Sequence, residues 1–326
     1  MVDKVLRMGV AGAGHFGRFH TQKIAANPRA ALSGVYDRDP ARAAAVAAEL
    51  GTVPLDFAAL LAMSDAIVVA APAEAHFLLA SQALIAGKHV LVEKPIAATL
   101  AEADTLAALA QQHQRILQVG HLLRFTPEHA AISAHMPHPI FIECIRIAPF
   151  KPRGTDVSVV LDLMIHDLDL VLSLVDAELE TVDAIGAPIA SAFEDIANAR
   201  LGFANGCVAM ITASRISMRT ERKMRLFGQH GYLNVDFDNR KLFRIGRGGE
   251  GTPIPDMEGA VMQHITWPAQ DALAAEHAAF VAAVLDGAPV RVDAAAGRRA
   301  LAAALLIAER MDVARAKAVR SGLIRP

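Results

Sequence analysis

Short apolar runs and longer helical runs alternate along the first 121 residues, and this alternation limits the possible fold more than any other feature. The short runs are rich in β-branched residues and end at glycine, proline or a charge, as in VLRMGVAG, ALSGVYD, DAIVVAAP and RILQVGH. The segments between them, such as PARAAAVAAEL, repeat leucine and alanine at helical spacing. Repeated strand–helix–strand order predicts a parallel sheet with helices on both faces.

A glycine-rich turn, GAGHFG, follows the first of these strands and opens a helix. In that context the three glycines allow a tight turn, close approach of a pyrophosphate, and close packing of helix on strand. The free N–H groups and the positive end of the helix dipole would face the phosphates. The alternative is a turn of the same kind without a ligand. The predicted dinucleotide site includes Gly12, Gly14, His15, Phe16 and Gly17.

The second strand ends at Asp37, 20 residues after Gly17. A carboxylate at this position can accept hydrogen bonds from the ribose hydroxyls of adenosine. Its charge would repel a 2′-phosphate, which favours NAD over NADP. Arg38, the next residue, leaves NADP open because a guanidinium could bind such a phosphate. As an alternative, Asp37 caps the turn that follows it.

The stretch LVEKPIAATL places Glu93, Lys94 and a proline where a buried strand ends. Ligands bind outside the carboxyl ends of the strands in an open parallel sheet, so we expect Lys94 to direct its charge toward the nicotinamide end of the cofactor. The alternative is a surface lysine before a proline. Further contacts to the cofactor are predicted for Ala71, Pro72, His76 and Glu93.

The segments GVAGAGHFG, VYD and GKHVLVEKP together resemble the Gfo/Idh/MocA family of sugar and polyol dehydrogenases, and the resemblance covers nearly the whole chain. The expected fold class is α/β. A Rossmann domain with a doubly wound parallel sheet is predicted for residues 1–121. An α+β domain with a large, mostly antiparallel open sheet is predicted for residues 122–326, for substrate binding and oligomerisation. This sheet would join a homodimer or a homotetramer.

Strand-like stretches after residue 121 fit that second sheet, and Asn205-Gly206 is a candidate hairpin turn. A helix is predicted from Val157 to Val175. Within it, Asp162 and His166 are four residues apart, so both lie on one helical face. The carboxylate can fix the tautomer of the imidazole, whose other nitrogen can then take a proton.

The family pattern carries the lysine of E-K-P and an Asp-x-x-x-His as catalytic groups, and Lys94, Asp162 and His166 match it. The resemblance implies His166 as the base, Asp162 as the residue that orients it, and Lys94 as the cation that stabilises the substrate oxygen. Lys94 and His166 could exchange roles. A pair on the helix surface is the alternative for Asp162 and His166. A metal set with His121 lacks a further ligand at a suitable spacing, so no metal is predicted.

Two segments, GHLLRFTP and RIAPFKPRGTD, resemble the branch of the family that oxidises UDP-N-acetylglucosamine-type sugars at C3. Arginines suit a diphosphate because the guanidinium binds such oxygens in pairs. A free polyol such as myo-inositol is an alternative substrate. A regulator that binds NAD without catalysis is a further alternative. The predicted substrate-binding residues are His121, Arg124, Arg146 and Arg153.

Composition excludes several other classes. The formal charge of the chain is −2 and no basic run occurs, so a nucleic-acid partner is not expected. No apolar segment approaches the roughly 18 residues of a membrane span. The two cysteines, Cys144 and Cys207, lie in strand-like stretches and are expected to be buried free thiols, which fits the cytoplasm.

Overall fold

The computed structural model describes residues 4–151, 157–229, 231–248 and 250–324. Within them the chain divides into two compact units. The first unit contains the chain up to Phe125 and the later segment Asp271–Leu301. The second contains Thr126–Gln270 and the chain from Ala302 onward. None of the described helices is both long enough and apolar enough to cross a bilayer.

The first unit is built on a parallel sheet of five strands in the order β2-β1-β3-β4-β5. In β3 every residue is buried, although successive side chains point to opposite faces, so both faces of the sheet are covered. This is the predicted Rossmann sheet. The strands are β1 (Leu6–Ala11), β2 (Ala30–Tyr36), β3 (Ala66–Val69), β4 (His89–Glu93) and β5 (Leu117–Gly120).

Local sequence signals explain where several helices of this unit begin. Asp39 and Asp56 cap helices with their carboxylates, and Thr99 forms a capping box with Glu102. The helices are α1 (His15–Ala26), α2 (Pro40–Leu50), α3 (Phe57–Met63), α4 (Ala73–Ile85), α5 (Leu100–Gln112), the 3₁₀ turn η1 (Leu122–Phe125), α8 (Ala272–Asp286) and the start of α9 (Ala294–Arg320).

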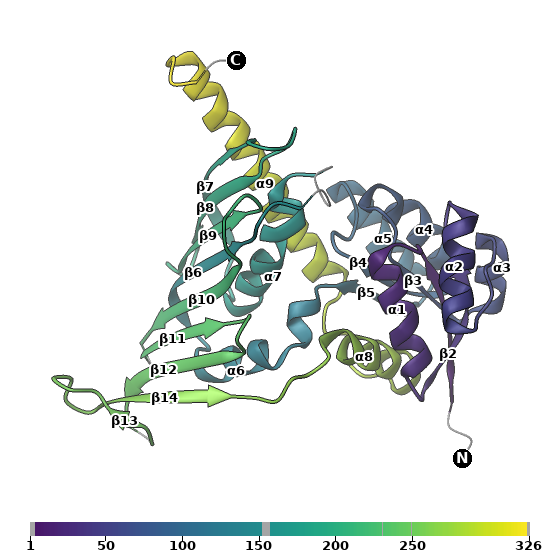
Figure 1. Ribbon diagram of the computed structural model, residues 1–326, viewed down its shortest axis with the longest axis horizontal. Helices are drawn as coiled ribbons and strands as arrows, with labels where there is room; N and C mark the ends of the chain where they lie inside the picture. The colour runs from purple at the N-terminus through teal and green to yellow at the C-terminus, as the bar shows by residue number, and fades with distance from the viewer. Residues whose placement is uncertain (1–3, 152–156, 230, 249, 325–326) are drawn as a thin grey trace. The chain divides into compact units, whose positions relative to one another are not determined.

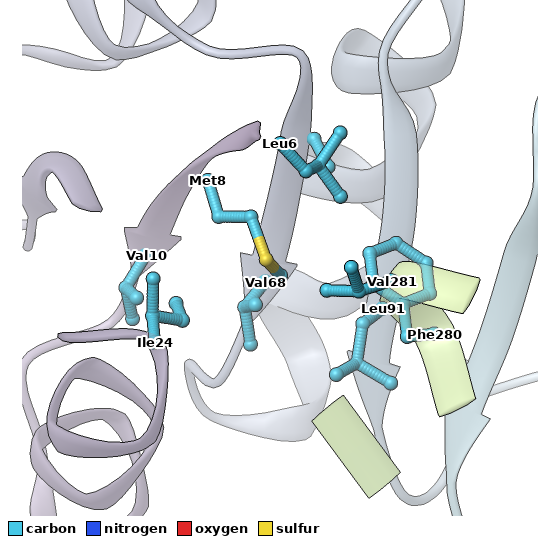
Figure 2. Close-up of a cluster of buried hydrophobic side chains, with 9 residues drawn as sticks. Leu6, Met8, Val10, Ile24, Val68, Leu91, Phe280 and Val281 are labelled. Atoms are coloured by element: carbon cyan, nitrogen blue, oxygen red, sulfur yellow. The ribbon is translucent and has the colours of Figure 1, made fainter. Parts of the chain in front are cut away.

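The core of the first unit joins the beginning of the chain to a segment near its end. Figure 2 shows Met8 of β1 and Leu91 of β4 in one cluster with Phe280 and Val281 of α8. All four side chains are at most 1% exposed. The prediction placed residues 122–125 and 271–301 in the second domain, whereas the structure includes them in the first unit, because the apolar face of α8 completes this core.

The second unit contains a sheet of nine strands in the order β13-β14-β12-β11-β10-β6-β9-β8-β7. Among the described strands of this sheet, only the β6–β9 pair is parallel, so the predicted, mostly antiparallel sheet is confirmed. Its strands, labelled in Figure 1, are β6 (Pro139–Ile147), β7 (Leu179–Ala187), β8 (Ile196–Phe203), β9 (Val208–Ser214), β10 (Glu221–Gly228), β11 (Gly231–Asp236), β12 (Lys241–Arg247), β13 (Thr252–Pro253) and β14 (Ala260–Thr266).

The predicted hairpin turn at Asn205-Gly206 joins β8 to β9. Gly206 has a φ of 82°, which a glycine adopts readily. The side chain of Asn205 accepts a hydrogen bond from the N–H of Cys207 at 3.0 Å. An asparagine before a glycine therefore closes this hairpin in the way that the sequence predicts.

Helices cover one face of the nine-stranded sheet. The helix α7 (Ile165–Leu174) packs on β6 and β9, and α6 (Pro127–His135) packs on β11. The helix predicted from Val157 begins differently, because a π-helical turn, η2 (Val160–Met164), precedes α7. Turns of this kind occur often at functional sites. Here it contains Asp162.

Candidate active site

Two glycines of the loop between β1 and α1 are required by packing, and a third faces open space. Gly12 has a φ of 115°, and a Cβ there would overlap the backbone of Ala70. A Cβ on Gly17 would overlap the carbonyl oxygen of Gly12. No heavy atom of the described residues lies within 4 Å of the place that a Cβ on Gly14 would take. A ligand can therefore approach the backbone closely at Gly14.

The helix after this loop offers N–H groups to an anion. Gly14 is the N-cap of α1, and no side chain of the described residues caps the helix there. His15 and Phe16 form the first turn, and both are exposed. The loop leaves β1 beside β3, where the strand order reverses, and such switch points bind ligands in open α/β sheets. These features fit the pyrophosphate of a dinucleotide.

Asp37 holds the glycine loop in place. One carboxylate oxygen, Oδ2, accepts a hydrogen bond from the N–H of Ala13 at 2.7 Å. The other, Oδ1, accepts from the N–H of Asp39 at 2.8 Å, so the turn-capping alternative describes part of its role. A carboxylate can accept about four hydrogen bonds, which leaves acceptor capacity for ribose hydroxyls. Arg38 is exposed.

Ala71 and Pro72 of the loop after β3 and His76 in the first turns of α4 are predicted cofactor residues, but the His76 side chain is engaged elsewhere. His76 is 1% exposed. Its Nδ1 lies 2.8 Å from the carbonyl oxygen of Pro95, and its Nε2 lies 2.8 Å from that of Ala71. Both ring nitrogens therefore contact backbone carbonyl oxygens. This corrects the prediction that the His76 side chain binds the cofactor directly. His76 joins the loop that contains Ala71 and Pro72 to the segment after Lys94.

Glu93 and Lys94 lie at the carboxyl end of β4, as predicted. The Glu93 side chain is only 12% exposed, and its Oε1 lies 3.0 Å from Nε2 of His20. Its other oxygen, Oε2, accepts a hydrogen bond from the backbone N–H of Lys94 at 3.2 Å. Lys94 is half-buried, and the peptide bond to Pro95 is cis. The Glu93 carboxylate thus faces the protein interior beside Lys94.

Sequence reasoning missed the residues that surround Glu93. His20 of α1 and His277 of α8 are buried, and His20 Nδ1 lies 2.9 Å from His277 Nε2. Glu276, next to His277, is fully buried. The sequence did contain a signal for His20, which shares the buried face of α1 with Gly17, Thr21 and Ile24. A polar side chain on the buried face of a helix needs a hydrogen-bond partner.

Two of the predicted substrate residues, His121 and Arg124, lie at the end of β5 in the first unit. His121 is 1% exposed, and Arg124 is half-buried in η1. The carbonyl oxygen of Arg124 accepts a hydrogen bond from Nη1 of Arg291 at 3.4 Å. The Arg291 guanidinium also lies over the ring of Phe125, 5.5 Å from its centroid.

The prediction that Arg146 binds a substrate phosphate needs correction. Arg146 is 7% exposed, and its guanidinium binds the carboxylate of Asp167 through two hydrogen bonds of 2.8 and 2.7 Å. The charge attracted to this arginine is therefore a buried carboxylate from the protein itself. Arg153, the other predicted arginine of this segment, lies outside the described residues.

The remaining predicted residues, Asp162 and His166, follow each other along one helical stretch of the second unit. Asp162 lies in η2 and His166 in the first turn of α7, and both are half-buried. Asp167, which follows His166, is the buried partner of Arg146. Asp162 and His166 therefore lie on a helical stretch that the Arg146–Asp167 ion pair ties to β6.

Comparisons with known proteins agree with this arrangement. Residues 6–121 match the model of an oxidoreductase family with an NAD-binding Rossmann fold. Residues 146–234 match the Gfo/Idh/MocA C-terminal domain. The chain belongs to the Gfo/Idh/MocA family. It is an NAD-binding oxidoreductase of the dehydrogenase type, which acts on CH–OH groups.

Individual relatives refine this picture. The chain is 43% identical to UDP-N-acetylglucosamine 3-dehydrogenase of Acidithiobacillus ferrooxidans, over 93% of this chain and 96% of the relative. A solved structure of that enzyme covers 94% of this chain and 98% of its own, with a TM-score of 0.90 and 41% identity. An inositol 2-dehydrogenase of Rhizobium meliloti is 27% identical, over 92% and 94% of the two chains. The resemblance read from the motifs is thereby confirmed.

Proposed function

We propose that the protein oxidises C3 of a UDP-N-acetylglucosamine-type nucleotide sugar, with NAD as the hydride acceptor. The observation that carries this proposal is the 43% identity to an enzyme of that name over nearly the full length of both chains. The inositol dehydrogenases are more distant, at 27% identity for the example that covers most of the chain. A cytoplasmic location is part of the proposal.

The proposed chemistry assigns a separate role to each of three side chains. Bound NAD would supply the acceptor for the hydride. His166 takes the proton of the substrate hydroxyl, since an imidazole titrates near neutral pH. Asp162 orients that imidazole. Lys94, as an ammonium, stabilises the negative charge that develops on the substrate oxygen. The exchange of roles between Lys94 and His166 remains an alternative assignment.

The cofactor contacts are proposed for the glycine loop and the strand ends near it. Gly14 and the N–H groups of His15 and Phe16 would bind the pyrophosphate. Asp37 would accept hydrogen bonds from the adenosine ribose, while its charge disfavours NADP. His121 and Arg124 are the candidates for substrate recognition in the first unit. Because Arg146 is paired with Asp167, we no longer assign it a substrate contact.

A second copy of the chain is the proposed partner of the sheet face that α6 and α7 leave uncovered. Aromatic side chains cross five strands on this face, with neighbouring ring centroids 4.7 to 6.3 Å apart. Phe227, which lies between Phe141 and Tyr232 in the series, is 38% exposed. Replacing it with glutamate should convert a dimer or tetramer to smaller species in light scattering. The aromatic series consists of Phe141, Phe227, Tyr232, Phe243 and His264.

The test of the substrate is the absorbance of NADH at 340 nm. Purified protein would be assayed with NAD⁺ or NADP⁺ against UDP-N-acetylglucosamine, other UDP-sugars, myo-inositol and glucose. A carbonyl trap draws the reaction forward. Activity with UDP-sugars alone supports the proposal. Activity with myo-inositol alone would move the function to polyol oxidation. Tight NAD binding without turnover of any substrate would favour a regulator.

A further inference from the structure

The first unit contains a buried cluster of four titratable side chains behind Lys94. His20 comes from α1, Glu93 ends β4, and Glu276 and His277 come from α8. A ring nitrogen of His20 and carboxylate oxygens of Glu93 and Glu276 all lie within 4.8 Å of one another. Burying this many ionisable groups is costly unless their charges are paired or removed.

The contacts distribute the charge of the cluster unevenly. Glu93 accepts a hydrogen bond from His20 at 3.0 Å, so its carboxylate has a partner. Both oxygens of Glu276 are fully buried and have no hydrogen-bond partner among the described residues. An ionised carboxylate without a partner in the interior is strongly disfavoured. A protonated carboxyl group at Glu276 removes the charge.

The pKa shifts of the two glutamates also indicate that Glu276 is protonated and Glu93 is charged. Burial, followed by the charge of Glu93, raises the pKa of Glu276 well above its usual range. Burial alone would also raise the pKa of Glu93, but the hydrogen bond and charge of His20, and the charge of Lys94, hold it below its usual value. The folded protein therefore favours a charged carboxylate at Glu93 and a protonated carboxyl group at Glu276.

The other charged groups around the cluster do not alter this balance. Burial, followed by the charge of His20, lowers the pKa of His277 well below its usual range, so this imidazole is neutral. Lys23 and Asp271 act on His277 with opposite signs, and they form an ion pair with each other at 2.6 Å. The neighbouring strand β5 faces the cluster with uncharged residues, Gln118 and Gly120.

The backbone leaves room for the Glu93 carboxylate and joins it to Lys94. A Cβ on Gly120 would lie 3.0 Å from Glu93 Oε1, so a side chain at that position would crowd the carboxylate. The Lys94 N–H donates to Glu93 Oε2 at 3.2 Å. Since Lys94 stabilises the charge of Glu93, the carboxylate stabilises the ammonium of Lys94 to the same extent.

We propose that Glu93 and His20 are positioning residues for Lys94: His20 holds the Glu93 carboxylate in place through their contact, and this carboxylate keeps the adjacent lysine in the ammonium form, while Glu276 holds a proton and carries no charge. The proposal rests on the proposed role of Lys94. In this proposal Glu93 stabilises the charge of Lys94 and does not make the direct contact to the cofactor that the sequence suggested.

The first experiment measures the titration of Lys94 without any substrate. Competitive labelling of amines with acetic anhydride, followed by mass spectrometry of the peptide that contains Lys94, gives its reactivity as a function of pH. Glu93→Gln should move this titration to lower pH by about one unit or more, because the fixed charge is lost. Glu276→Gln should leave it in place, because one neutral group replaces another.

A set of variants makes the test decisive. Asp286→Asn removes an exposed carboxylate from the same helix as Glu276 and serves as a matched control for the loss of an acidic residue. His20→Gln retains a hydrogen-bond donor for Glu93 and loses the imidazole, and it should leave the Lys94 titration closer to that of the wild type than Glu93→Gln does, because the carboxylate remains. An unchanged Lys94 titration in Glu93→Gln would overturn the proposal. A shift in Glu276→Gln as large as in Glu93→Gln would also overturn it.

Two further measurements separate this proposal from others. One equivalent of a divalent cation in the purified protein, lost in Glu276→Gln, would show that a metal and not a proton balances the charge, and would overturn the proposal. With a substrate found, the activity of Glu93→Gln should decline at a lower pH than that of the wild type, by the same shift that labelling gives for Lys94, while the KM for NAD stays the same. The labelling result stands whether or not a UDP-sugar is the substrate.

Discussion

Arg146 binds Asp167 in the interior of the second unit through two hydrogen bonds, from Nε to Oδ2 at 2.8 Å and from Nη2 to Oδ1 at 2.7 Å. Arg146 belongs to β6, and Asp167 directly follows His166 in α7. The ion pair therefore ties the sheet to the helical turn that contains the proposed base. A guanidinium suits this task because its planar donors match both carboxylate oxygens.

Removing one partner of this ion pair should destabilise the protein strongly. We expect Asp167→Asn or Arg146→Met to lower the free energy of unfolding by about 3–5 kcal/mol, because a buried charge is left without a partner. Urea denaturation measures this, and the double variant should be less destabilised than the sum of the two. A loss below about 1 kcal/mol, together with a raised KM for a UDP-sugar, would return Arg146 to substrate binding.

The two proposed catalytic groups can be tested separately. His166→Ala and Lys94→Ala should each reduce kcat at least a hundredfold, since proton transfer and charge stabilisation each contribute on that scale. NAD binding, measured by fluorescence titration, should persist in both variants. His138→Ala replaces an exposed histidine of the second unit and should leave kcat unchanged. A near-normal rate in either variant removes that residue from the mechanism.

Cofactor preference depends on the charge of Asp37, which also anchors the glycine loop through Ala13. Asp37→Asn retains an oxygen that can accept the Ala13 N–H and removes the charge. We expect the ratio of kcat/KM for NAD to that for NADP to fall at least tenfold in this variant, with little change in Tm. Asp37→Ala should lower Tm as well, because the loop loses its anchor. An unchanged ratio in Asp37→Asn would refute the assigned role.

Glu276 should make stability depend on pH in a way that Glu276→Gln abolishes. Its pKa in the folded protein is raised above the usual value of 4.5, so the folded state binds the proton more tightly than the unfolded state. The stability that this proton contributes is complete below about pH 4.5 and is lost as the pH rises through the raised folded-state value. Across that window the free energy of unfolding falls by at most roughly 1.4 kcal/mol per pH unit.

The measurement is urea denaturation from pH 5 to pH 9. Glu276→Gln should match the wild type near pH 5 and exceed it by about 1 kcal/mol or more at pH 8. Asp286→Asn, in an exposed ion pair with Arg29, should differ from the wild type by less than about 1 kcal/mol at every pH. Parallel curves for the wild type and Glu276→Gln would mean that Glu276 is not a buried neutral acid.

Local patterns predicted most of the architecture because they determine local structure. The alternation of strands and helices predicted the parallel sheet, and the glycine spacing predicted the loop after β1. Asn205-Gly206 predicted a hairpin. What failed depends on contacts between distant residues. Asp167 lies 21 residues beyond Arg146, and no sequence spacing indicates that the two side chains meet in the interior. The arginine therefore resembled a ligand for a phosphate.

Contacts between distant residues also explain why the sequence did not predict the place of α8 in the first unit or the cluster behind Lys94. Helical periodicity can identify α8 as a helix, but it does not say which core the apolar face of that helix joins. His20 and His277 are 257 residues apart, and only the return of α8 to the first unit brings them together. The E-K-P segment singled out Lys94 as a candidate, whereas the buried cluster next to it also draws side chains from α1 and α8.

That return of the chain has a consequence for biosynthesis. The first unit cannot complete its core until Phe280 and Val281 have been made, although its sheet is finished at Gly120. A ribosome that adds about 5–20 residues per second needs roughly 10 seconds or more to cover that interval. During this time the apolar surface that α8 later covers stays exposed on the nascent chain. We therefore expect the chain up to Phe125 to depend on chaperones until α8 has been synthesised.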